Sequence, residues 1–86
     1  MEQSTTVQIT LDEDDEHTEA QATIRLRERD FIARGTARRN PRDPNVPVVG
    51  EELAVARALS ELSHQLLAAA AENIEGFVGH RVTLTD

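Results

Sequence analysis

A proline-rich connector constrains the fold of this 86-residue chain more than any other feature. The three prolines of the chain all lie within residues 40–49, at Pro41, Pro44 and Pro47. Because a proline disfavours helical geometry at the residue before it, we expect residues 40–49 to be non-helical. The connector therefore divides the chain into two parts with different secondary structure.

The part after the connector predicts one long helix. Gly50 is the expected N-cap, and Glu51 and Glu52 follow where the positive end of the helix dipole favours acids. The helix is expected over Leu53–Phe77, with Gly79 as its C-terminal stop. Apolar residues recur along it at helical spacing, which predicts one buried stripe. The stripe comprises Val55, Leu59, Leu62, Leu66, Ala69 or Ala70, Ile74 and Phe77.

The part before the connector predicts three strands. Apolar and polar residues alternate over Thr6–Leu11, His17–Arg27 and Phe31–Arg39, which is typical of strands with one buried face. A charged loop, Asp12–His17, and a short turn, Glu28–Asp30, are expected to join them. Connections this short favour an antiparallel meander.

The inner face of this sheet is expected to carry the small and apolar residues of the second and third strands. They are Ala20, Ala22, Ile24, Leu26, Phe31, Ala33, Gly35 and Ala37. A glycine inside a strand often marks a close approach of another element or a bulge, and we expect one of these at Gly35.

The predicted fold class is α+β, in one domain over residues 1–86. A three-stranded antiparallel meander and a short C-terminal strand, Arg81–Thr85, pack on one long helix in the order βββαβ. The helix, at about 38 Å, is longer than strands of about 20–30 Å. This overhang, and a core with only two phenylalanines as its aromatic residues, favour a homodimer. Exchange of the C-terminal strand between subunits is left open.

The charge of the chain is unevenly distributed. The net charge is −7, and residues 1–19 hold seven acids and no lysine or arginine. Residues 25–42 hold seven of the nine arginines, and the chain has no lysine. Arginine presents a planar fork that suits phosphate and carboxylate, although a GC-rich genome would also favour it over lysine. The predicted binding residues for an anionic partner are Arg25, Arg27, Arg34, Arg38 and Arg39.

Two interpretations of these arginines remain open. In the first, they bind nucleic-acid phosphate or an acidic protein surface, and alternation places Arg25, Arg27, Arg34 and Arg38 on the side of the sheet away from the helix. Alternatively, the face is merely solvated, and its arginines pair with Glu19, Glu28, Asp30 or the acidic loop. The outer face lacks aromatic residues, which argues against a stacking platform for single-stranded nucleic acid.

Several classes of function find no support in the sequence. The chain has no cysteine, and its three histidines show no metal-ligand spacing. We therefore expect no enzymatic activity, no metal, no cofactor and no small-molecule substrate. The longest apolar run is too short to span a bilayer, and no signal peptide is evident, so we expect a cytoplasmic protein without a membrane partner.

Residues 39–62, RNPRDPNVPVVGEELAVARALSEL, resemble a small actinobacterial family of unknown function. That family shows an Asn-Pro-x-Asp element, then Val-Pro, a glycine and a helix similar to EL-x-x-ARALS-(D/E)-L. The later AAAENIE, residues 69–75, also fits, whereas Val48-Val49 replaces a common Glu-Ile.

The resemblance implies a dsRBD-like fold that forms dimers. It also implies a stress- or dormancy-associated protein, because the family includes dormancy- and hypoxia-induced members. Similarity of the family to ribosome hibernation promoting factors implies binding to the ribosome or its RNA. No catalytic residues are implied.

Overall fold

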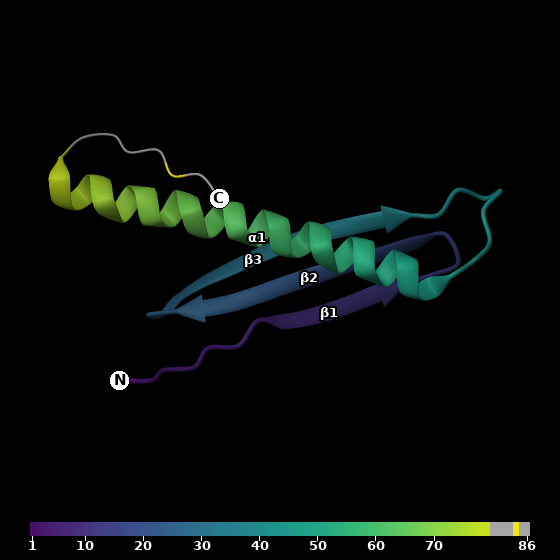
Figure 1. Cartoon of the computed structure of the whole chain (residues 1–86), viewed down its shortest axis with the longest axis horizontal. Helices are drawn as coiled ribbons and strands as arrows, with labels where there is room; N and C mark the ends of the chain where they lie inside the picture. Colours follow the sequence, from purple (N-terminus) through teal and green to yellow (C-terminus); the bar gives the residue numbers. More distant parts are fainter. Residues whose placement is uncertain (80–83, 85–86) are drawn as a thin grey trace.

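Three strands and one helix follow one another along the chain. In the computed structural model, which describes residues 1–79 and 84, these elements are β1 (Gln8–Glu13), β2 (His17–Leu26), β3 (Arg29–Arg38) and α1 (Pro47–Val78). The strands form one antiparallel sheet in the order β1-β2-β3, and α1 lies across one face of it (Figure 1). The predicted α+β meander on one long helix is confirmed. The predicted C-terminal strand falls outside the described residues except for Leu84.

The core lies between α1 and the inner faces of β2 and β3. In the sheet register Ala20 lies opposite Gly35, and Ala22 lies opposite Ala33. The predicted inward residues of the two strands are buried, except for Leu26, which is exposed. Because most of these inward side chains are small, the helix can approach the sheet closely.

The closest approach is at Gly35. A Cβ atom at this position would lie 2.2 Å from the backbone nitrogen of Ala58 and 2.3 Å from the carbonyl oxygen of Ala54. Both alanines are fully buried. The backbone of α1 therefore rests directly on the backbone of β3, which confirms the expected close approach.

The helix begins earlier than predicted. It starts at Pro47, with Val46 as the N-cap, so the expected non-helical conformation of residues 47–49 is wrong. Proline is favoured at the first helical position, because its fixed φ suits a helix and its missing N–H would have no helical partner there. As a result, Gly50 is not the N-cap, and the first turn contains no acid.

The buried stripe of the helix also differs from the prediction. Small residues form much of it: Ala54, Ala58 and Ala69 are buried together with Leu62. Leu59, Ile74 and Phe77 are exposed, and Phe77 is 90% exposed. The reason is that the sheet presents alanine and glycine at the contact, so small side chains of the helix face it.

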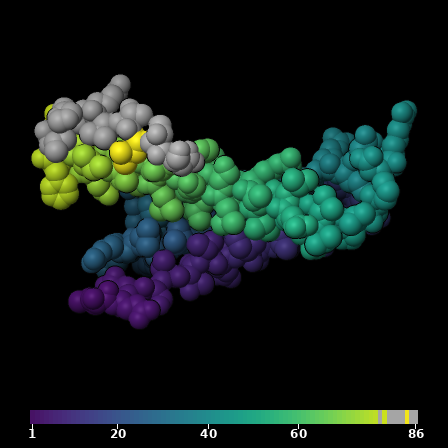
Figure 2. Space-filling model, viewed as in Figure 1, coloured from purple at the N-terminus to yellow at the C-terminus, as the bar shows by residue number. Residues whose placement is uncertain are grey.

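The helix overhangs the sheet, as predicted. Its 32 residues span about 48 Å, whereas the ten residues of β3 span about 33 Å. The C-terminal end of α1 therefore projects past the strands (Figures 1 and 2). The helix ends at Gly79, the expected stop, which has a φ of 76° and donates its N–H to the carbonyl of Glu75 at 2.8 Å.

The strand boundaries shift by a few residues. β1 lies two residues later than predicted, so Asp12 and Glu13 pair with β2 rather than belonging to the loop. The turn between β2 and β3 is formed by Arg27 and Glu28, with φ values of 49° and 70°. Positive φ at both central residues is typical of a two-residue hairpin turn. The prediction that Arg27 lies in a strand is therefore wrong.

We predict that Gly35→Ala destabilises the protein by about 2–3 kcal/mol or more, because the new methyl group meets helix backbone that cannot rotate away. Urea unfolding followed by circular dichroism measures the loss. Gly76→Ala is the control: nothing lies within 4 Å of its Cβ position, and it should stabilise the helix by about 0.5–1 kcal/mol. Equal effects of the two substitutions would contradict the close contact.

Candidate functional site

The outer face of the sheet is exposed because α1 covers only the inner face. On β2 this outer face carries Glu19, Gln21, Thr23 and Arg25. On β3 it carries Ile32, Arg34, Thr36 and Arg38, all of them exposed. Three of the five arginines predicted to bind a partner therefore lie on one face. Ile32 is 53% exposed among them and adds an apolar spot to an otherwise polar surface.

Two of these arginines pair with carboxylates of the same face. Arg25 lies opposite Asp30 in the register, and its Nε is 3.8 Å from the carboxylate. The Nε of Arg34 lies 3.7 Å from the carboxylate of Glu19 and donates to the Gln21 side-chain oxygen at 3.1 Å. The charged side chains of both pairs are more than half exposed. Exposed pairs of this kind contribute about 0–1 kcal/mol, so a binding partner can displace them at little cost.

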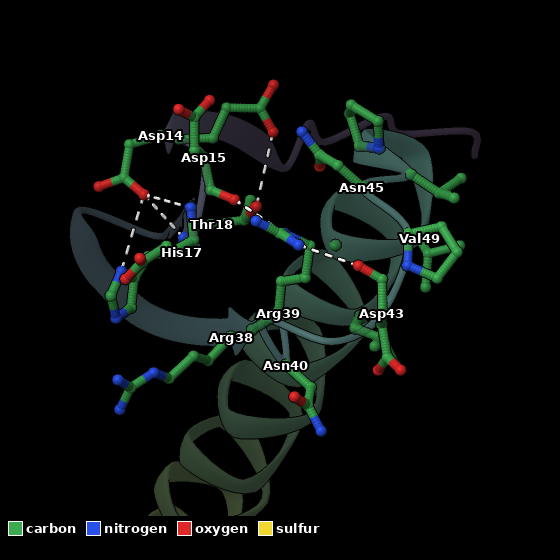
Figure 3. Close-up of a pocket in the computed structure, with 18 residues that line it drawn as sticks. Asp14, Asp15, His17, Thr18, Arg38, Arg39, Asn40, Asp43, Asn45 and Val49 are labelled. Atoms are coloured by element: carbon green, nitrogen blue, oxygen red, sulfur yellow. Dashed lines mark hydrogen bonds and ion pairs between the residues drawn. The ribbon is translucent and has the colours of Figure 1, made fainter.

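Arg38 differs from these two arginines. It lies at the end of β3 opposite His17, and its side chain is exposed. Its guanidinium makes no hydrogen bond or ion pair with the residues that the structure describes. In Figure 3 it points away from the neighbouring Arg39. Arg27 lies at the far end of β2, in the hairpin turn, apart from the outer face.

Arg39 is used within the fold. Its Nε donates to the carbonyl of Asp15 at 3.0 Å, and a terminal nitrogen donates to the carbonyl of Asp43 at 2.9 Å (Figure 3). Its backbone N–H donates to the carbonyl of Glu16 at 2.8 Å. The half-buried Arg39 thus ties the β1–β2 loop to the proline-rich connector.

The loop between β1 and β2 is shaped by Asp14. Its carboxylate accepts the backbone N–H groups of Glu16 and His17, both at 2.8 Å. These two bonds, in that order, lower the pKa of Asp14. The imidazole Nδ1 of His17 lies 3.7 Å from the same carboxylate. The acids here build a hairpin loop, and within residues 1–79 and 84 no three metal-ligating side chains gather as a metal site would require.

A pocket of about 450 Å³ lies where this loop, the end of β3, the connector and the start of α1 meet (Figure 3). Its lining combines acidic residues of the loop with apolar residues of the connector and helix, among them Val46, Val49 and Leu53. Thr18 is buried at its wall, with its hydroxyl 3.5 Å from the Glu13 carboxylate. Sequence reasoning missed this pocket, because two stretches that are distant in sequence form it: the β1–β2 loop, and the chain from the end of β3 through the connector to the start of α1.

Two carboxylates meet close to this pocket. Glu13 ends β1, and Glu51 lies in the second turn of α1. A hydrogen bond with Glu13, and then the negative charge of Glu13, raise the pKa of Glu51. The raised pKa means that the charge of Glu13 disfavours ionisation of Glu51, so this contact supports the packing of the helix start against β1 less as the pH rises.

The helix α1 was also compared with the length and apolarity that a membrane span requires. No helix among the described residues is long and apolar enough to cross a bilayer.

Comparisons with known proteins find a matching family model and similar mycobacterial proteins. A model of the Rv2632c-like family matches residues 3–83. The chain is 47% identical over 70 residues to the uncharacterised protein MT1780 of Mycobacterium tuberculosis (strain CDC 1551), covering 81% of this chain and 74% of that protein. It is 39% identical over 77 residues to the uncharacterised protein Rv2632c of M. tuberculosis (strain H37Rv), covering 90% and 83%.

A solved structure shares the architecture. The crystal structure of Rv2632c matches with a TM-score of 0.86 at 35% identity, covering 93% of this chain and 95% of that chain. The arrangement of sheet and helix described above is therefore common to both proteins.

We predict that Arg39→Ala lowers the free energy of unfolding by about 1–2 kcal/mol, because two backbone carbonyls lose a charged donor. Arg38→Ala removes the same charge from the preceding residue without breaking a hydrogen bond. Its free energy of unfolding should therefore stay within about 0.5 kcal/mol of that of the wild type. Chemical denaturation of both variants provides the comparison. Equal losses would show that charge, rather than the bracing contacts, matters.

We predict that Glu51→Gln stabilises the protein at pH 7 and has less effect at acidic pH. The folded-state pKa of Glu51 is raised, so its stability contribution is complete below the unfolded value of about 4.5 and is lost as the pH rises through the folded value. Thermal melts between acidic and neutral pH measure the difference. Glu52→Gln, at the exposed neighbouring position of the same helix, controls for the lost interaction with the helix dipole. An equal gain in stability from Glu52→Gln at pH 7 would contradict repulsion between Glu51 and Glu13.

Proposed function

Since the chain belongs to the Rv2632c-like family, whose curated relatives compared above are described only as uncharacterised, we propose its function from its own geometry. We propose that it is a non-enzymatic interaction protein of the cytoplasm that offers the outer face of its sheet to a macromolecular partner. The observation that carries the proposal is the one-sided packing of the sheet. It leaves Arg25, Arg34 and Arg38 exposed together.

The partner that best suits this face is an acidic protein surface. Glu19 and Asp30 already lie beside two of the arginines, so the face carries both signs of charge. A phosphate backbone carries negative charge at every repeat, so it would also be repelled by these carboxylates. A protein surface can instead place acids next to the arginines and an apolar side chain on Ile32.

A homodimer is part of the same proposal. The helix overhang leaves Phe77 almost fully exposed, with Ile74 nearby in sequence and 37% exposed. A second subunit that covers this end of α1 would bury both side chains. Self-association is a common way for a small domain with a light core to gain burial.

A second candidate function is binding to the ribosome or ribosomal RNA in stressed or dormant cells. Arg38 favours it, because its guanidinium makes no ion pair among the described residues and is open to a phosphate. The resemblance to dsRBD-like, dormancy-associated proteins similar to hibernation promoting factors points in the same direction. Such binding would weaken steeply with salt.

A photo-crosslinking amino acid placed at Thr36 tests both candidates in starved cells. We expect crosslinks to protein rather than to RNA, and their loss in the Arg34→Ala/Arg38→Ala variant. Arg29→Ala/Arg42→Ala removes the same charge away from the outer face, and should leave the crosslinks intact. Crosslinks that persist in the first variant, or none at all, would contradict a binding role for this face.

Sucrose-gradient sedimentation of the same lysates separates the candidates further. Presence in ribosomal fractions at low salt, and loss at high salt and in the Arg34→Ala/Arg38→Ala variant, would favour the ribosome over a protein partner. If the protein stays at the top of the gradient at low salt, the ribosomal candidate fails.

A further inference from the structure

The two edges of the sheet differ in whether side chains of α1 cover them. On β3, the side chain of Gln65 donates to the carbonyl of Ile32 at 2.9 Å, and Arg57 donates to the carbonyl of Thr36 at 2.7 Å. Two side chains of α1 thus occupy backbone acceptors that an added strand would use. Covering an edge in this way is a common means of preventing further strand pairing.

The other edge, β1, has no such cover among the described residues. β1 pairs with β2 in an unbroken register from Gln8 opposite Thr23 to Glu13 opposite Thr18. It contains no proline and no bulge, either of which would discourage a further strand. Every second residue of such an edge directs its N–H and C=O away from the sheet, so β1 offers a row of free donors and acceptors.

The inner face of β1 is also incompletely covered, because α1 packs on β3 and β2. Ile9 is half-buried at the margin of the core, and Leu11 is 45% exposed although it points toward the helix side. Figure 2 shows the surface of this N-terminal segment open along one side of the helix. An added strand would place alternate side chains over these two residues.

The charge around β1 selects the occupant. Residues 1–19 hold seven acids and no lysine or arginine, and the run Asp12–Glu16 lies at the end of the strand. A second copy of this chain would add further acids to this surface and neutralise none of them. A cationic segment would be attracted.

We propose that β1 binds an extended basic segment of another protein, which adds to the sheet as an edge strand. Backbone hydrogen bonds along β1 hold the segment, as in other cases of strand addition. Its lysines or arginines lie near Asp12–Glu16, and its apolar residues lie over Ile9 and Leu11. This surface is separate from the arginine-bearing outer face, so the two proposals stand or fall independently.

The probe is a short acetylated peptide of alternating lysine and valine with a fluorescent label, titrated with the intact protein in an anisotropy assay. A copy that is N-methylated at every amide keeps the charge but can donate no backbone hydrogen bond from either edge. We expect the unmodified peptide to bind at least about tenfold more tightly than the methylated copy. Hydrogen exchange of β1 amides should slow on binding.

Leu11→Glu is the decisive variant. It adds a negative charge, which would strengthen purely electrostatic binding, but it removes the apolar contact and should weaken binding about tenfold. Ile32→Glu makes the same change on the outer face of β3 and should not weaken binding. Circular dichroism confirms that both variants fold.

The proposal is overturned by equal binding of the methylated peptide, by tighter binding of the peptide to Leu11→Glu, or by no binding at low salt. If the protein is a dimer that Leu11→Glu converts to monomer, β1 pairs with a second copy and the proposal also fails.

Discussion

The contact between the backbone of α1 and Gly35 of β3 determines the rest of the structure. Because no side chain separates the two backbones there, the helix must present alanines to the sheet, and Ala54 and Ala58 are fully buried. The core is filled by close contact between the helix and sheet backbones rather than by large side chains. This suits a chain with two phenylalanines and no tryptophan or tyrosine. Protein interiors are packed to near-crystalline density, so even one added methyl group at such a contact lowers the stability of the fold.

This contact also decides which surfaces stay open. The helix is centred on β3 and β2, where it shields the edge of β3 through Arg57 and Gln65. It leaves β1 and the whole outer face uncovered by described residues. Among the described residues, these uncovered surfaces are the parts of the molecule that are available to partners.

Much of the fold could be predicted from the sequence, because alternation and helical spacing are local patterns. The three strands, their inner and outer residues, the long helix and its stop at Gly79 all follow from such patterns. The start of the helix could not be predicted in this way, because a proline has two opposite effects. It breaks a helix when it lies in the interior, but it is favoured at the first helical position, where Pro47 lies. The buried stripe differs from the predicted one at Leu59 and Phe77, because the sheet leaves room only for small side chains at the contact and these large ones stay exposed.

The candidate site could be predicted in outline but not in detail. Alternation placed Arg25, Arg34 and Arg38 on one face, and the structure agrees. It could not foresee that Arg27 would lie in a turn with positive φ, or that Arg39 would join the distant carbonyl of Asp15 to the nearby carbonyl of Asp43. Contacts between segments far apart in sequence, such as those around the pocket, leave no local pattern.

The partners of the arginines distinguish their roles. Arg39 and Arg57 donate to backbone carbonyls, which cannot move without disturbing a loop or a strand, so these two arginines belong to the fold. Arg25 and Arg34 instead face exposed carboxylates at 3.7–3.8 Å, and such pairs contribute little to stability. Because a side-chain carboxylate can rotate away, each of these arginines can exchange its present carboxylate for an acidic group of a binding partner. A face built from such pairs is suited to reversible binding, whereas a face built only for stability would gain more from buried apolar contacts.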